Sequence, residues 1–242
     1  MNTSHLSGRT IVITGGSSGI GLALAQIVVE RGAVPIIVGR NEQRLASALA
    51  ALGSAGSGLA ADCTRPADWD RIIDHAQRQH GGIDVLVQCH GAGGRIAPLE
   101  HLTASDIDQV IAINLSSVIN GCRTVLPHMR AVGRGHIVTV GSACSYRSWP
   151  EWSVYTAAKA GLVGFTRCLH REMVEWGGKA TFFAPGAAQT GFQQAAGLEV
   201  DLSGYPTGAD MAAILAAQID LPDHLFVEHC AAWGTAQVVT PF

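Results

Sequence analysis

Hydrophobic residues recur along this chain in two rhythms that alternate regularly. Short aliphatic and β-branched runs without polar alternation predict buried parallel strands, and the longer stretches between them repeat apolar residues at helical spacing. We predict strands at residues 9–14, 34–38, 58–61, 85–89, 136–140 and 180–184, and helices at residues 19–31, 42–52, 66–80, 105–129 and 152–176. The alternation predicts an α/β protein with a doubly wound parallel sheet.

The rhythm weakens after Pro185. It resumes as a predicted helix at residues 209–218 and ends in a predicted strand around residues 225–227. The irregular insertion at about residues 189–207 has the position of a loop that shapes a substrate pocket. A chain of 242 residues with 48% hydrophobic residues and no internal repeat is expected to form a single domain, residues 1–242.

Charge and special residues narrow the classes of function. With 16 basic and 19 acidic residues and no run of one sign, the chain predicts a small-molecule partner rather than nucleic acid or a membrane surface. The N-terminal residues lack the apolar core of a signal peptide and no segment has the apolar length of a membrane span, so a cytoplasmic protein is expected. The six cysteines and ten histidines lack metal-ligand spacing, which predicts reduced thiols and no metal site.

Residues 14–21, Thr-Gly-Gly-Ser-Ser-Gly-Ile-Gly, lie where the first predicted strand turns into the first helix. Glycine permits a tight turn and lets backbone N–H groups approach a pyrophosphate at a helix N-terminus, where the helix dipole favours negative charge. The position therefore indicates a dinucleotide-binding turn of the Rossmann fold rather than a simple tight turn. The residues expected to contact the dinucleotide are Gly15, Ser17, Ser18, Gly19, Ile20 and Gly21.

The end of the second predicted strand bears on which dinucleotide binds. A carboxylate there would accept hydrogen bonds from the ribose hydroxyls of NAD and repel the 2′-phosphate of NADP. Gly39 occupies this place and is followed by Arg40, whose guanidinium matches a phosphate in bidentate geometry. NADP(H) is therefore favoured and NAD(H) remains the alternative, in which Arg40 is an ordinary solvated arginine at a helix start.

Asp62 follows the third predicted strand, with Cys63 beside it. A carboxylate here is placed to accept a hydrogen bond from an adenine amino group, and it is also placed to cap the next helix near Thr64. The two roles are compatible, so Asp62 and Cys63 are both candidate cofactor contacts.

Tyr155 and Lys159 are four residues apart within the predicted helix at 152–176, so both side chains lie on one helix face. A nearby cation stabilises phenolate, which predicts a tyrosine pKa lowered from about 10 toward the range in which a general acid/base works. Such a pair also occurs by chance on a solvated face, so its assignment depends on the neighbouring motifs.

Ser142 and Asn114 provide that context. Ser142 follows the predicted strand at 136–140, at the strand end where ligands bind in this architecture, and its hydroxyl is placed to stabilise charge on a substrate oxygen. Asn114 lies within the predicted helix at 105–129, where asparagine is a poor helix former. It is expected either to bond its own backbone or solvent, or to hold a water in a proton path.

Together these motifs resemble the short-chain dehydrogenase/reductase family over nearly the whole chain. Residues 14–21 match its T-G-x-x-x-G-x-G motif, and its Asn-Ser-Tyr-Lys tetrad is matched in order and spacing by Asn114, Ser142, Tyr155 and Lys159. The family's P-G-x-x-x-T segment, which contacts the nicotinamide carboxamide, is similar to the segment that contains Pro185, Gly186, Ala188 and Thr190.

The resemblance implies a mechanism and an assembly. Hydride would pass between the nicotinamide and a substrate carbon while Tyr155 exchanges the proton. Lys159 would also bind the nicotinamide ribose, which makes both residues cofactor contacts, and Asn114 would position a relay water. The common family assembly implies a homotetramer or homodimer built on the two long helices that contain Asn114 and Tyr155.

The chain departs from the family after its fourth predicted strand, where Gln88-Cys89-His90-Gly91 replaces Asn-Asn-Ala-Gly. Backbone atoms do much of that motif's work, so Cys89, His90 and Gly91 are still expected to contact the cofactor. His90 is either a pH-sensitive contact beside the cofactor or a histidine tolerated at the start of a loop.

The predicted function is an NADP(H)-dependent oxidoreductase that acts on CH–OH groups and interconverts a carbonyl and an alcohol. One alternative is an NAD-dependent alcohol or dihydrodiol dehydrogenase, and another is a non-catalytic dinucleotide sensor on the same fold. The substrate stays open, because Trp149, Trp152 and Phe192 fit an apolar cavity whereas Arg95 or Arg147 fits an anionic substrate.

Overall fold

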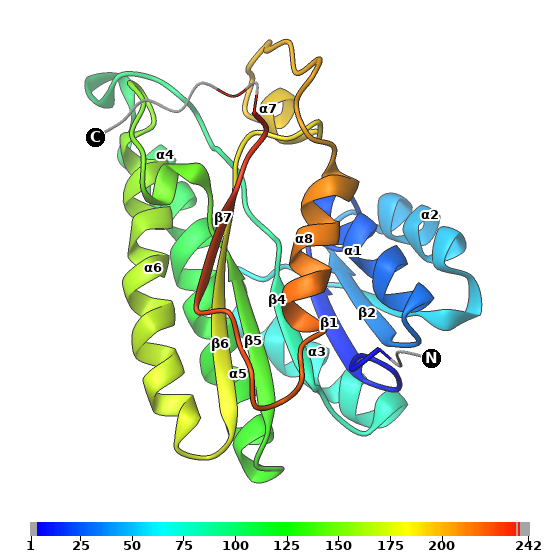
Figure 1. Ribbon diagram of the computed structural model, residues 1–242. Helices are drawn as coiled ribbons and strands as arrows, with labels where there is room; N and C mark the ends of the chain where they lie inside the picture. The colour runs from blue at the N-terminus through cyan, green and yellow to red at the C-terminus, as the bar shows by residue number, and fades with distance from the viewer. Residues whose placement is uncertain (1–3, 236, 238–242) are drawn as a thin grey trace.

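Seven parallel strands form one continuous sheet in the computed structural model, which describes residues 4–235 and residue 237 (Figure 1). The order across the sheet is β3-β2-β1-β4-β5-β6-β7, which confirms the doubly wound α/β fold. The strand order reverses between β1 and β4, the place where such sheets bind ligands. The strands are β1 (Thr10–Thr14), β2 (Val34–Gly39), β3 (Ser57–Ala60), β4 (Val85–Gln88), β5 (Gly135–Val140), β6 (Gly178–Pro185) and β7 (His229–Ala232).

Helices cover both faces of the sheet (Figure 1). One layer consists of α1 (Gly19–Glu30), α2 (Glu42–Leu52) and α8 (Gly208–Ile219), and the other of α3 (Pro66–His80), α4 (Ala104–Ile111), α5 (Ser117–Ala131) and α6 (Ser153–Val174). In β1, Ile11 and Ile13 pack into the first layer and Val12 into the second. Burial on both faces explains why the strands carry continuous apolar runs. The shorter helices are η1 (Gly53–Ala55), η2 (Leu99–His101), η3 (Ala112–Ser116), η4 (Ala143–Ser145) and α7 (Phe192–Ala195).

The helix predicted at residues 105–129 extends over Ala104–Ala131 and contains one wide turn. α4 and α5 are joined by the π-helical segment η3, which holds Asn114. In the described part of the chain, this 28-residue run is the one helix long and apolar enough to cross a membrane, which corrects the expectation that no segment has that length. Packing accounts for part of this apolar character, because α5 lies against α3 and buries Val118, Cys122 and Val125, and 39% of the apolar window is buried.

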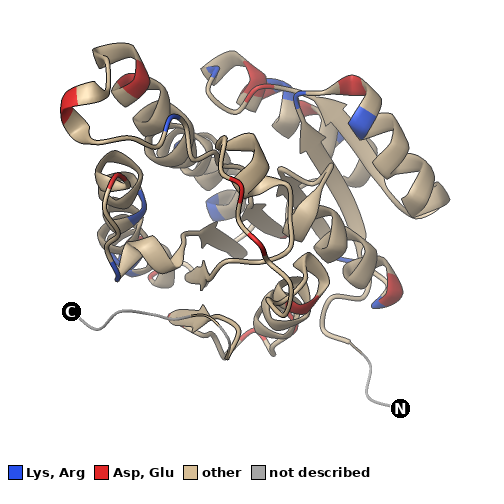
Figure 2. Ribbon diagram, turned by 90° about the horizontal axis from the view of Figure 1, so that it is seen from above, with Lys and Arg blue, Asp and Glu red and all other residues tan. Residues whose placement is uncertain are grey.

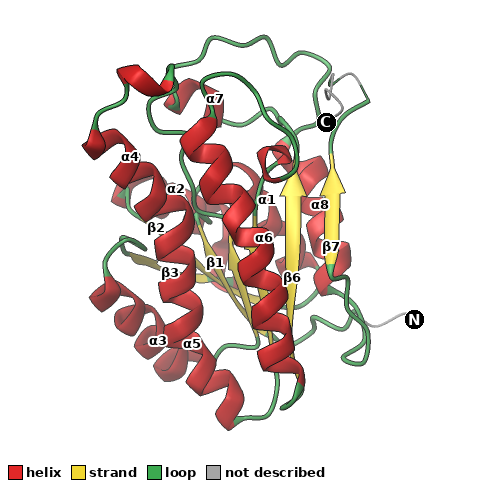
Figure 3. Ribbon diagram, turned by 90° about the vertical axis from the view of Figure 1, so that its left-hand side faces the viewer, coloured by secondary structure: helices red, strands yellow, loops and turns green. Residues whose placement is uncertain are grey.

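The final strand lies later in the chain than predicted. β7 runs beside β6 (Figure 3), whereas residues 225–227 form an irregular loop, so the predicted strand there is wrong. Contacts from distant residues fix this loop: Lys179 Nζ donates to the Leu225 carbonyl at 2.8 Å, and Phe226 stacks on His170 with ring centroids 4.0 Å apart. The apolar run that resembled a strand therefore anchors a loop.

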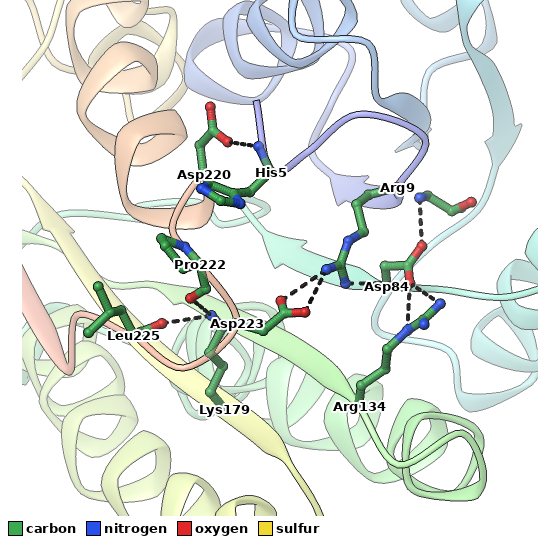
Figure 4. Close-up of polar contacts among 10 residues, drawn as sticks. His5, Arg9, Asp84, Arg134, Lys179, Asp220, Pro222, Asp223 and Leu225 are labelled. Carbon is green, nitrogen blue, oxygen red and sulfur yellow. Dashed lines mark hydrogen bonds and ion pairs between the residues drawn. The ribbon is translucent and has the colours of Figure 1, made fainter. Parts of the chain in front are cut away.

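Ion pairs join distant segments at the amino ends of the strands (Figure 4). Asp84 accepts from the Thr10 N–H at 2.9 Å and pairs with Arg134 at 3.1 Å and with Arg9 at 3.8 Å. Arg9 also donates to both carboxylate oxygens of Asp223 at 2.9 Å. We call Arg9, Asp84, Arg134 and Asp223 the amino-end network. It holds the segment after α8 against the start of β1.

Charged side chains are otherwise dispersed over the molecule. Seen from above, Lys and Arg are interspersed with Asp and Glu on helices and loops (Figure 2). The formal net charge of −3 likewise gives no excess of basic residues of the kind that nucleic-acid binding uses.

Candidate functional site

The proposed site residues converge at the carboxyl ends of β1, β4, β5 and β6. The glycine turn follows β1, residues 88–91 end β4, and Ser142 follows β5. α6 brings Tyr155 and Lys159 to this edge, and Lys159 Nζ donates to the Val140 carbonyl at the end of β5 at 2.9 Å. Residues far apart in the sequence thus share the edge at which ligands bind in this architecture.

Tyr155, Ser142 and Lys159 form one cluster. The Ser142 side chain lies close enough to the Tyr155 phenol to lower its pKa, and Lys159 Nζ lies 5.8 Å from the centre of the tyrosine ring. Tyr155 is 6% exposed and Lys159 is 3% exposed, so both are shielded from bulk water. Ser142 also caps η4, because its hydroxyl oxygen accepts from the Cys144 N–H at 3.2 Å. This cap fixes the serine beside the tyrosine.

Burial dominates the ionisation of the cluster and reverses the shift expected for Tyr155. Desolvation raises the pKa of the phenol above its ordinary value, the Cys144 thiol adds to the rise, and the Ser142 hydrogen bond offsets part of it. Burial also lowers the pKa of Lys159 to about 8. The prediction of a lowered tyrosine pKa is wrong for this structure, because desolvation outweighs the Ser142 contact and Lys159 is not among the groups that shift the pKa of the phenol. The phenol therefore keeps its proton at neutral pH.

Asn114 is fully buried in η3, and its side-chain amide hydrogen-bonds backbone atoms of the protein. The Nδ2 group donates to the carbonyls of Ala92 at 2.7 Å and Val110 at 3.0 Å, and Oδ1 accepts from the Ala92 N–H at 3.2 Å. Both amide hydrogens are thus occupied. The side chain holds the loop after β4, and a relay water held by Asn114 would have to bond other atoms of the residue.

The segment at residues 88–91, which departs from the family motif, packs directly on this cluster. Gln88 Nε2 donates to the Val118 carbonyl at 3.0 Å, which joins β4 to α5. A Cβ added at Gly91 would lie 2.9 Å from Asn114 Oδ1 and 3.3 Å from Lys159 Nζ, so a side chain there would displace both. Burial raises the pKa of the Cys89 thiol to about 12, which keeps it protonated.

His90 is bonded at both ring nitrogens. Nδ1 lies 2.6 Å from Thr14 Oγ1, and Nε2 lies 2.8 Å from Ser117 Oγ. Burial, together with the nearby charge of Lys159, lowers the pKa of the imidazole to about 3. His90 is therefore neutral near physiological pH, which contradicts a pH-sensitive contact in that range. Sequence reasoning missed Ser117, although it follows Asn114 by three positions and so lies on the same side of the helix.

The glycine turn fits a pyrophosphate. Gly15 has a φ of +69°, and a Cβ there would lie 2.9 Å from the His90 backbone nitrogen. Both the backbone angle and the close approach require glycine. The first residue of α1 is Gly19, and its N-cap Ser18 makes no side-chain capping bond, so the helix start keeps backbone donors for an anion. Thr190, in the segment after β6, lies over Gly19.

The end of β2 has no room for the acidic side chain that favours NAD, and it offers hydrogen-bond donors to the 2′-phosphate of NADP. A Cβ at Gly39 would lie 2.6 Å from Ser17 Oγ, so the serine hydroxyl occupies the space that an acidic side chain would need. Arg40, the next residue, is exposed. The hydroxyl and the guanidinium together offer the donors that a 2′-phosphate accepts.

Asp62 has the local bonds of a cap. Its Oδ1 accepts from the Thr64 N–H at 3.0 Å and from the Thr64 hydroxyl at 2.8 Å. Burial alone would raise the pKa of the carboxyl, but these two bonds and the charge of Arg40 lower it below its ordinary value. The Cys63 carbonyl accepts from Trp69 Nε1 at 2.9 Å, so the Asp62-Cys63 backbone is held in place beside Arg40.

Aromatic side chains border the phenol on the side of the insertion. Trp152 and Phe192 have ring centroids 5.4 Å and 5.7 Å from that of Tyr155, and Trp149 packs on the same cluster. We call Trp149, Trp152 and Phe192 the aromatic wall. Phe192 begins α7, which lies above the carboxyl ends of the strands (Figure 3). Arg95, a candidate for binding an anionic substrate, is exposed, and its guanidinium lies 3.8 Å from the Asp106 carboxylate.

Comparisons with known proteins place the chain in a family. A family model described as short chain dehydrogenase matches residues 9–200. The D-beta-hydroxybutyrate dehydrogenase of Cupriavidus necator is 34% identical over 186 residues, which cover 75% of this chain and 71% of that protein. The 3-oxoacyl-acyl-carrier-protein reductase FabG of Vibrio cholerae is 31% identical over 191 residues, covering 79% of this chain and 78% of that protein. A metagenomic short-chain oxidoreductase, solved in complex with NADP, is similar with a TM-score of 0.81 and 26% identity, over 93% of this chain and 96% of that chain.

Proposed function

Because this chain belongs to the short-chain dehydrogenase/reductase family of NAD(P)-binding oxidoreductases, we propose that it is an NADPH-dependent reductase that converts a carbonyl compound into an alcohol. One observation carries this function: the phenol of Tyr155 is buried, with the Ser142 hydroxyl and the Lys159 amine beside it. A proton donor to a substrate oxygen must itself carry the proton and lie within hydrogen-bond reach of that oxygen.

NADP(H) is the cofactor that the carboxyl edge fits. The glycine turn and the start of α1 would hold the pyrophosphate, and Ser17 with Arg40 would hold the 2′-phosphate. Lys159 would bond the nicotinamide ribose, and the segment from Pro185 to Thr190 would bond the carboxamide. When bound, the reduced nicotinamide supplies the hydride. The NADP complex of the metagenomic relative supports this choice.

The ionisation of the cluster favours reduction. A phenol that keeps its proton is ready to donate it to the carbonyl oxygen, and the Ser142 hydroxyl is placed to donate a hydrogen bond to the same oxygen. The charge of Lys159 then lowers the cost of the phenolate that donation leaves behind. In the oxidative direction, Tyr155 would first have to lose a proton against its raised pKa.

The aromatic wall favours an apolar carbonyl substrate over an anionic one. Its rings lie against Tyr155, where the substrate carbonyl must reach the phenol, while Arg95 is already paired with Asp106. An aryl alkyl ketone should therefore be reduced with a lower KM than a keto acid of similar size. Phe192→Ala should raise the KM for the ketone and leave that for the keto acid nearly unchanged.

The test combines cofactor choice with turnover. Purified protein is mixed with NADPH or NADH and a panel of aldehydes and ketones, and the absorbance of the reduced nicotinamide is followed. We expect reduction that is faster with NADPH and lost in Tyr155→Phe. Turnover with NADH alone would indicate the NAD-dependent alcohol or dihydrodiol dehydrogenase. Tight NADPH binding without turnover of any carbonyl or alcohol would indicate the non-catalytic sensor.

We propose further that the chain works as a single-domain subunit of a cytoplasmic homotetramer or homodimer. The support is the family's common assembly, in which the helices that contain Asn114 and Tyr155 meet across subunits. Light scattering after gel filtration gives the mass in solution, and a monomer at micromolar concentration would contradict the assembly.

A further inference from the structure

We infer that His90 is a positioning residue, whose imidazole ties the glycine turn to the π-helical segment that holds Asn114 and so sets the geometry of the site. Its effect on turnover rests on the proposed function, whereas the link itself does not. The family motif has alanine at this position, so the ring is a feature of this chain. The ring connects the end of β1 to the start of α5 at the carboxyl edge of the sheet.

The hydrogen bonds fix the tautomer of the ring. Ser117 has one hydroxyl hydrogen and donates it to the Ile113 carbonyl at 2.8 Å. Its oxygen must therefore accept from His90 Nε2–H at 2.8 Å, which leaves Nδ1 as an acceptor. The Thr14 hydroxyl has one hydrogen and two acceptors in reach, Nδ1 at 2.6 Å and the Val87 carbonyl at 3.5 Å, and the shorter contact takes the hydrogen. The bonds thus run in one direction, from Thr14 through the imidazole and Ser117 to the backbone of η3.

The charges around the ring favour this neutral state. Burial is the largest effect and opposes a second proton, as do the cations of Lys159 and Arg40; the Asp62 carboxylate favours one and is outweighed. A protonated ring would also lose the bond that Nδ1 accepts from Thr14. The link therefore keeps its geometry across the pH range in which the enzyme would work.

Both ends of the link touch groups that matter to the proposed reaction. At one end, Thr14 precedes the glycine turn, and Gly15 lies against the His90 backbone. At the other end, Ile113 precedes Asn114, whose amide holds Ala92 two residues after His90. The ring and the asparagine amide thus fix residues 90–92 to the helix at two points. Gly91, between them, packs on the Lys159 amine.

Loss of the ring should let η3 shift relative to the glycine turn. Asn114 and Lys159 meet at the Gly91 backbone, so such a shift alters the position of the lysine that supports Tyr155. A displacement of about 1 Å at a reacting group can cost about a hundredfold in rate. The expected signature is a lower kcat with the KM for the carbonyl substrate nearly unchanged.

Four single variants and one double variant test the two hydrogen bonds of the ring. A glutamine amide reaches about as far as Nε2 and an asparagine amide about as far as Nδ1, so His90→Gln keeps the Ser117 bond and His90→Asn keeps the Thr14 bond. We expect His90→Ala and Ser117→Ala each to lower kcat about tenfold to a hundredfold, without a further loss in the double variant. Glutamine should restore kcat more than asparagine does. All variants are assayed well below their melting temperatures, which separates turnover from folding.

Nitrogen NMR of histidine-labelled protein tests the link without any turnover. We expect His90 to be protonated at Nε2 alone and not to titrate between about pH 5 and pH 8, a range that includes the ordinary histidine pKa. A proton on Nδ1, titration in this range, additive losses in the double variant, or a His90→Ala kcat within twofold of the parent would each overturn the inference. If the parent reduces no carbonyl, the proposed function fails, while the NMR result still decides the link.

Discussion

The two edges of the sheet use polar side chains in opposite ways. At the amino ends of the strands, Asp84 is matched by Arg9, Arg134 and the Thr10 backbone (Figure 4). At the carboxyl ends, Tyr155 and Lys159 are buried together with their ionisation displaced by desolvation. Opposite charges pair at one edge, whereas at the other edge burial shifts the pKa values of a phenol and an amine.

This difference shows how one parallel sheet separates stability from chemistry. The amino-end network contains salt bridges and backbone hydrogen bonds, and we expect its loss to be felt in the free energy of unfolding. The carboxyl edge holds a buried amine and a buried phenol, which cost stability and are typical of functional sites. Variants at the two edges should therefore fail in different assays.

The largest expected effect is on turnover. Tyr155→Phe removes the proposed proton donor and should lower kcat by about a hundredfold to ten-thousandfold, while the affinity for NADPH stays within a few-fold. Stopped-flow oxidation of NADPH measures the rate, and nicotinamide fluorescence measures the affinity. Tyr146→Phe is the matched control, because the Tyr146 hydroxyl is buried without a hydrogen-bond partner among the described residues. A Tyr155→Phe enzyme as fast as the Tyr146→Phe enzyme would contradict the mechanism.

The next effect is on stability, at the opposite edge. Asp84→Ala leaves Arg9 and Arg134 without this carboxylate and should destabilise the fold by about 2 kcal/mol, which lowers Tm by about 4–8 °C. Differential scanning calorimetry measures the shift. Asp74→Ala removes an exposed pair with Arg78 and should change Tm by about 1–2 °C at most. Equal shifts in the two variants would show that the network contributes no more than a surface ion pair.

The choice of cofactor should respond to one side chain at the carboxyl edge. Arg40→Ala removes the guanidinium proposed to hold the 2′-phosphate, so the Kd for NADPH should rise about tenfold or more while the Kd for NADH stays unchanged. Titration of nicotinamide fluorescence gives both constants. Arg44→Ala, one turn further along in α2, is the control and should alter neither. A similar loss for both cofactors would remove Arg40 from the recognition of the phosphate.

The buried amine of Lys159 should make the stability of the fold depend on pH. Burial lowers the pKa of Lys159 from 10.5 to about 8, so between these values the unfolded chain binds more protons than the folded one. Stability contributed by this group therefore rises with pH across that window, by at most about 1.4 kcal/mol per pH unit. Lys159→Met should be more stable than the parent below pH 8, and urea unfolding should show the difference shrinking as pH rises toward 10. A difference independent of pH would contradict the buried cation.

Local signals explain how much of the fold could be predicted from the sequence. The predicted bounds of α2 and α3 agree with the structure, because the Asn41 cap and Pro66 at a helix start are signals within the chain itself. The last strand was predicted too early in the chain, because Lys179 and His170, both distant in sequence, hold residues 225–227 in a loop before β7. Sequence patterns report neighbours along the chain, and this loop depends on neighbours in space.

The same limit applies to the candidate site. Motif spacing predicted that Ser142, Tyr155 and Lys159 act together, and the structure places them in one cluster. The direction of the tyrosine pKa shift could not be predicted, because it depends on how much water the fold excludes rather than on the distance to Lys159. The bonds of His90 to Thr14 and Ser117 likewise come from three separate elements.

The most direct test of the separation between the two edges measures Tm and kcat on Tyr155→Phe and Asp84→Ala in parallel, with NADPH and one ketone that the parent reduces. If the two edges have separate roles, one variant should lose only kcat and the other only Tm. Tyr155→Phe should keep the parent Tm and lose nearly all turnover, whereas Asp84→Ala should melt several degrees lower and keep the parent kcat at a temperature where it is fully folded. Parent-like turnover in Tyr155→Phe, or a large loss of kcat in folded Asp84→Ala, would contradict it.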